Sequence, residues 1–163
     1  MDQLDYVGEL TAAPVDSNLK DAALVDKKGH HEFRGNVFHL LWAAGMTRPD
    51  ISFDVAVVSG ATNALTVANA EKAAKVVKKA KRSKVFLLFP RITGPVVMIV
   101  YCDSTCVNLS YGKTGCGIFL ALAAFTEHGG NEVFCPIGWS SKRLRGLVRS
   151  TFAGEMLTAC SPC

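Results

Sequence analysis

The sequence has no long uncharged apolar stretch, and this absence limits the classes of protein to which it can belong. The longest such run, Thr114 to Thr126, falls well short of the ~20 residues that a membrane-spanning helix needs. The first ten residues are acidic and contain no apolar segment of the kind found in secretory signals. We therefore expect an intracellular protein, cytoplasmic or nuclear, with no signal peptide and no membrane span.

Aromatic residues and charge are also modest, at 9% and 20% of 163 residues, whereas apolar residues make up 49%. This composition is typical of a globular chain and excludes an intrinsically disordered one. The length allows one domain with its own core, or a small domain with an appendage. The net charge of +4 is compatible with nucleic-acid contact but equally common among enzymes, so it decides little.

Disulfides are not indicated, although the chain contains six cysteines. Without a secretory signal, we expect reduced thiols that act mostly as small core residues. Cys160-Ser-Pro-Cys163 forms a CxxC pair, and a zinc site combining it with Cys102 and Cys106 is one alternative. The spacing of that second pair is unlike a zinc knuckle, so core thiols remain the preferred interpretation.

The first half of the chain predicts helices after an irregular start. Residues 1–30 are rich in Asp and Lys without periodicity, which predicts an irregular arm with a short extended piece near Ala12 to Val15. Apolar residues then recur at helical spacing, and Gly45 is placed to end the first helix. Residues 31–84 are thus predicted to be a helical linker. Its expected helices span 31–44, 49–58 and 66–82.

The third of these helices carries an unusual number of lysines. A solvated basic face is one interpretation, and a surface that faces a phosphate backbone is the other, since each phosphate contact adds salt-dependent affinity. A second basic stretch precedes the last predicted helix. The candidate nucleic-acid-binding residues are Lys72, Lys75, Lys79, Arg82, Lys142, Arg143, Arg145 and Arg149.

From residue 85 the pattern changes to β. A short apolar run, Val85 to Phe89, precedes three runs at 96–101, 115–125 and 133–139, which predict strands joined by tight connections. Such strands form an antiparallel meander. Ser150 is a good N-cap for a following helix. The expected fold class is α/β (α+β-like), with the helical segment first and the meander plus a helix second.

Two carboxylates in this part of the chain are candidate catalytic residues. Asp103 ends the first predicted strand, and Glu155 lies in the first turns of the last helix. Phosphodiester hydrolysis with two magnesium ions needs carboxylates that converge on metals about 3.5–4 Å apart, and hard oxygen ligands suit Mg²⁺. On spacing alone, a solvated strand-end Asp and a helix-surface Glu are the preferred explanation of the pair.

A series of short motifs, in order and at compatible spacing, resembles the region that follows the reverse transcriptase in copia-type retrotransposon polyproteins. The first, within residues 41–55, is Thr47-Arg48-Pro49-Asp50-Ile51, similar to the family's Thr-Arg-Pro-Asp-Ile. The family then has a helix with a lysine-rich end and a short apolar strand, matched by residues 70–89. The remaining matches are Val100-Tyr101-Cys102-Asp103-Ser104, Lys113-Thr114-Gly115-Cys116-Gly117, Trp139-Ser140-Ser141-Lys142-Arg143 and Arg149-Ser150-Thr151-Phe152-Ala153-Gly154-Glu155.

This resemblance implies a ribonuclease H-like domain over residues 85–163, with cleavage of the RNA strand of an RNA–DNA hybrid as the family's activity. It implies that Asp103 and Glu155 are catalytic residues and Mg²⁺ ligands. The family's third catalytic Asp lies on a fourth strand, and no carboxylate follows Glu155 here. We therefore expect a truncated, incomplete ribonuclease H-like domain with weak or no activity.

The same resemblance leaves one side of the strand at 96–101 without a neighbour. An exposed, uncharged strand edge favours pairing with another chain, so we expect a protein partner that covers it. Three functions stay open: a ribonuclease H by descent, a non-catalytic subunit or interaction module of a larger assembly, and a nucleic-acid-binding remnant.

Overall fold

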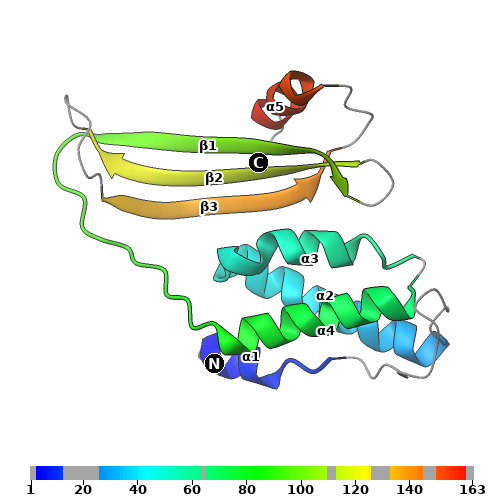
Figure 1. The fold of residues 1–163 in the computed structure, drawn as a ribbon. Coiled ribbons are helices and arrows are strands. Elements are labelled where there is room, and N and C mark those ends of the chain that lie inside the picture. Colours follow the sequence, from blue (N-terminus) through cyan, green and yellow to red (C-terminus); the bar gives the residue numbers. More distant parts are fainter. Residues whose placement is uncertain are drawn as a thin grey trace. The chain divides into compact units, whose positions relative to one another are not determined.

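The computed structural model describes residues 3–12, 26–63, 65–109, 113–125, 133–144 and 150–160. The chain divides into two compact units, Met1–Val85 and Phe86–Cys163. The first unit is helical, and the second contains a three-stranded antiparallel sheet and one helix (Figure 1). The predicted order of elements, helices followed by an antiparallel three-stranded sheet, is therefore confirmed, as is the mixed α/β class.

The helical unit is built around the apolar faces of its helices. Phe33, Val37 and Leu40 lie on one face of α2 and are almost completely buried. They pack with residues from the neighbouring elements into one core, and each such side chain contributes about 1.5–3 kcal/mol through burial. The elements are α1 (Gln3–Glu9), α2 (Lys27–Met46), the 3₁₀ helix η1 (Pro49–Ile51), α3 (Ser52–Ser59) and α4 (Val67–Arg82).

Side-chain caps explain where these helices begin. The Asp26 carboxylate accepts a hydrogen bond from the Gly29 amide at 2.8 Å, so α2 starts earlier than the apolar spacing predicts. The Thr66 hydroxyl caps α4 at the predicted place. Gly45 does not end α2, which continues to Met46, because a glycine can remain helical at a modest cost.

The prediction of an irregular arm over residues 1–30 was wrong for its first part. Gln3–Glu9 forms α1, and Val7 and Leu10 are buried in the helical core. Tyr6 lies against Trp42, with ring centroids 4.6 Å apart. Three-residue spacing of two apolar side chains is a weak local signal, and tertiary packing stabilises the helix. Most of the extended piece expected at residues 12–15 lies outside the described residues.

The sheet has the order β1-β2-β3, with β1 (Val96–Leu109), β2 (Lys113–Ala124) and β3 (Phe134–Arg143). β2 and β3 lie within a few residues of the predicted ranges, whereas β1 continues eight residues beyond the predicted end at Tyr101. The helix α5 (Thr151–Ala159) packs on β1 and β2, as Figure 1 shows. Its N-cap is the predicted one, because the Ser150 hydroxyl accepts a hydrogen bond from the Ala153 amide at 3.1 Å.

The two faces of the sheet differ in what covers them. Ser104 pairs with Cys116, and the Thr158 side chain hydrogen-bonds the Cys116 thiol, so α5 covers this face. Side chains alternate between faces along a strand, and paired residues share a face. The other face carries Tyr101 and Phe119, whose ring centroids are 6.3 Å apart. We call these the α5 face and the aromatic face.

The short apolar strand that the resemblance implies before β1 is absent, which is a correction. Residues 85–89 have no regular structure, and Phe86, Leu88 and Phe89 are exposed by 69%, 75% and 66%. In Figure 1 this segment is an extended connection leading into β1. A strand requires a hydrogen-bonded neighbour, and a local apolar run cannot specify one.

The burial of Cys116 predicts a difference in reactivity among the cysteines. Cys116 is buried, and burial raises the pKa of its thiol, whereas Cys102 and Cys160 are exposed. Because the thiolate is the reactive form, alkylation at neutral pH should modify Cys102 and Cys160 before Cys116. Peptide mass spectrometry after timed alkylation measures this order, with a urea-unfolded sample as the control. Equal rates at Cys116 and Cys102 in the folded protein would contradict it.

The same shift gives a dependence of stability on pH. The pKa of Cys116 is raised in the folded state, so the unfolded chain loses this proton first as pH rises. The free energy of unfolding is therefore unaffected by ionisation of Cys116 at neutral pH, and it falls as pH rises through the alkaline range in which the unfolded chain loses this proton. A Cys116→Ala variant should show a smaller loss of stability across that range in denaturant titrations.

Candidate functional site

The structure places the two predicted catalytic carboxylates on different sides of the sheet. Asp103 is exposed on β1, and its neighbour Ser104 is buried on the α5 face. Since adjacent side chains alternate, Asp103 points to the aromatic face. Glu155 belongs to α5 and is exposed. Asp103 thus lies on the face of β1 opposite the one that α5 covers.

The Mg²⁺ that the resemblance implies would be held by Asp103 and Glu155. A two-metal site needs several carboxylates converging on ions about 3.5–4 Å apart. Within the described part of the chain, no three His, Cys, Asp or Glu residues gather closely enough to hold a metal ion. The alternative zinc site uses Cys106 and Cys163, whose side chains lie outside the described ones.

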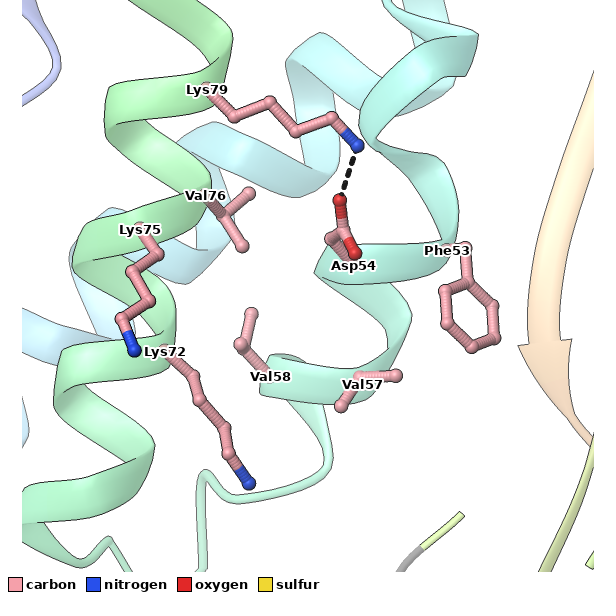
Figure 2. A pocket seen from close by; sticks show the side chains of 8 residues that line it. All are labelled: Phe53, Asp54, Val57, Val58, Lys72, Lys75, Val76 and Lys79. Carbon is pink, nitrogen blue, oxygen red and sulfur yellow. Dashed lines mark hydrogen bonds and ion pairs between the residues drawn. The ribbon is translucent and has the colours of Figure 1, made fainter. Parts of the chain in front are cut away.

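Three of the predicted basic residues line one groove between α3 and α4. Lys72, Lys75 and Lys79 follow one another at spacings of three and four residues, which places them on one face of α4. Figure 2 shows this groove, whose volume is about 300 Å³, at the lower end of the usual range for ligand pockets. The lining residues are Phe53, Asp54, Val57, Val58, Lys72, Lys75, Val76 and Lys79.

The groove combines an apolar floor with a positive rim. Val58 and Val76 are buried at its base, and Phe53 is half exposed at its side. The Lys79 ammonium lies 2.6 Å from an Asp54 carboxylate oxygen, the dashed contact in Figure 2.

Among the described residues, Lys72 and Lys75 have no ion-pair partner. The lining of the groove therefore contains one carboxylate and three ammonium groups. An anionic ligand that places an apolar part on the valine floor would find both kinds of contact here.

The other predicted basic residues do not join this groove. Arg82 is exposed at the end of α4 and does not line it. Lys142 lies on β3 and is half buried. Its charge and a backbone hydrogen bond lower the pKa of Cys116 and so partly offset the larger effect of burial. The side chain of Arg143 and the whole of Arg145 and Arg149 lie outside the described parts of the chain.

Two residues of the Thr-Arg-Pro-Asp-Ile motif have a structural role that the sequence did not reveal. Arg48 is only 2% exposed, and its Nε and Nη2 donate to the two carboxylate oxygens of Asp50, each at 2.8 Å. Its Nη1 donates to the Ala80 carbonyl at 2.7 Å, near the end of α4. Helix-terminal carbonyls lack intrahelical partners, so Arg48 satisfies one of them. The Arg48–Asp50 pair thereby fixes η1 against α4.

No protein-family model, curated protein or solved structure gives a significant match to this chain. In the described segments, no helix is long and apolar enough to cross a membrane.

Proposed function

We propose that this chain is a non-catalytic, ribonuclease H-like remnant of a copia-type element that binds nucleic acid through the groove between α3 and α4. One observation carries the binding part. Lys72, Lys75 and Lys79 line a groove with an apolar floor, and only Lys79 has a carboxylate partner among the described residues. Ammonium groups attract phosphates and release counterions on binding, which gives salt-dependent affinity without base recognition.

The position of the carboxylates supports the non-catalytic part. Asp103 lies on the face of β1 opposite the one that α5 covers, and Glu155 belongs to α5, which argues against one metal ion shared by both carboxylates. The motif series from Thr47 to Glu155 supports the ribonuclease H-like ancestry. Fold ancestry does not by itself confer activity, and function has to be argued from the site.

Binding should be measured by fluorescence anisotropy with a labelled RNA–DNA hybrid over a range of salt concentrations. Three lysines that each neutralise one phosphate predict a slope of log affinity against log salt between about −2 and −3. A neutral polymer of similar length is the control and should not bind. A slope near zero would refute nucleic-acid binding at the groove.

Catalysis is tested separately with the same hybrid and Mg²⁺. We expect no cleavage above background, and binding that is equal in the wild type and in Asp103→Asn, because Asp103 is not part of the groove. Magnesium-dependent cleavage that disappears in Asp103→Asn would instead establish a ribonuclease H. Alkaline hydrolysis of the hybrid provides a size ladder and shows that the RNA strand is cleavable.

A further inference from the structure

β1 has a free edge, which lies outside the proposed nucleic-acid-binding groove. Among the described strands, β1 pairs only with β2, so its other side has no strand neighbour. Its register with β2 is continuous from Val96 to Thr105. Between Pro95 and Asp103 the strand is uncharged, and Met98 is 63% exposed. Long, regular, uncharged edges of this kind are templates for strand pairing.

The hydrogen bonds at the start of β1 show which backbone groups are unpaired. The Phe125 amide donates to the Pro95 carbonyl at 2.8 Å. In an antiparallel pair, a residue directs both its N–H and its C=O to the same neighbour, and alternate residues do so. Val97, Ile99 and Tyr101 therefore bond to β2. The residues whose N–H and C=O point to the free edge are Val96, Met98, Val100 and Cys102.

We propose that this edge pairs with the same edge of a second copy of the chain, antiparallel about a two-fold axis at Ile99. In this register Val96 faces Cys102 of the partner, and Met98 faces Val100, so every outward N–H and C=O meets an outward group. The pairing joins the two three-stranded sheets into one continuous sheet. Because both copies use the same edge, the two-fold dimer is closed.

The position of the charged Asp103 favours this register. The axis at Ile99 keeps Asp103 at the end of the paired segment. The two Asp103 carboxylates then lie at opposite ends and do not repel each other. The exposed side chains of Met98 and Val100 become cross-strand neighbours on the α5 face, which stabilises such pairs.

The other edge of the sheet is unsuited to this pairing. β3 contains Pro136, and its register with β2 shifts between Leu120 and Ala121. It also ends in Lys142 and Arg143. Proline, bulges and basic residues are the features that protect an edge strand from association. The proposed interface is therefore formed by β1 of one copy and β1 of the other.

Sedimentation equilibrium of the full chain tests the dimer directly. The wild type should show twice the 17.5-kDa mass of one chain. Met98→Pro should be monomeric, because it removes an outward N–H without removing a bond to β2. Met98→Ala is the matched control and should remain dimeric. A wild-type monomer at every concentration, a mass with a different protein bound, or a dimeric Met98→Pro would overturn the proposal.

A cross-link tests the register and does not require the proline variant to fold. Ile99 and its symmetry mate form a non-hydrogen-bonded pair, with Cα atoms about 4.5 Å apart, which is within the range for a disulfide. Ile99→Cys should therefore form a 99–99 disulfide between chains under mild oxidation. Val97→Cys, which faces Tyr101 of the partner, should form no 97–97 link. Peptide mapping separates these links from those of the native cysteines, and a 97–97 link without a 99–99 link would contradict the register.

Discussion

Replacing Arg48 with alanine should lower the free energy of unfolding of the helical unit by about 3–5 kcal/mol, the usual cost of breaking a buried ion pair. The substitution removes both hydrogen bonds to Asp50 and the bond to the Ala80 carbonyl. Asp50 is 23% exposed and can regain some water, so the lower part of this range is expected. Urea unfolding followed by circular dichroism at the helix band measures the change.

Two further variants show whether the hydrogen-bond geometry or the charge of Arg48 is responsible. Arg48→Lys keeps the charge but cannot form the two-pronged contact with Asp50, so it should recover only part of the stability. Arg34 on α2 is exposed and is the matched control. Arg34→Ala should change stability by less than about 0.5 kcal/mol. If Arg48→Ala were as stable as Arg34→Ala, the contact between η1 and α4 would contribute nothing to the fold.

Reversing the charge of Lys72 and Lys75 together should weaken nucleic-acid binding by about 10- to 100-fold and reduce the salt slope by about 2, one for each phosphate that is no longer neutralised. The two side chains lack carboxylate partners among the described residues, so they are the groups available to a phosphate. Anisotropy titrations with the labelled hybrid at several salt concentrations measure both quantities.

The control for this experiment has the same change in net charge at a different place. Lys81 and Lys84 are exposed and do not line the groove. Reversing both should lower affinity only slightly through long-range repulsion and leave most of the salt slope intact. If the two double variants weakened binding equally, affinity would depend on overall charge and the groove would have no special role.

Local signals in the sequence were sufficient for most of the helices and for the meander. The apolar spacing of α2 and α4 and the caps at Thr66 and Ser150 act within one or two helical turns. Short turns between β-rich runs imply antiparallel neighbours. The irregular arm and the strand at 85–89 were incorrect, because α1 and any strand depend on partners that are distant in the chain.

The candidate sites depended much more on tertiary structure. The sequence identified Lys72, Lys75 and Lys79 as basic, but Asp54 and the apolar side chain of Val58 come from α3, and only packing forms the groove. It also identified Asp103 and Glu155 as acidic. Whether they meet depends on the face to which each points, and one residue of register reverses that face.

By itself, then, the sequence determined most of the helical and extended segments and which residues carry charge, because those properties depend largely on neighbours within a few positions. Tertiary structure alone decided that Arg48 reaches Ala80, that three lysines share a groove, and that Asp103 lies away from the α5 face. Each of these depends on how distant segments pack and pair, which a local pattern of residues does not encode.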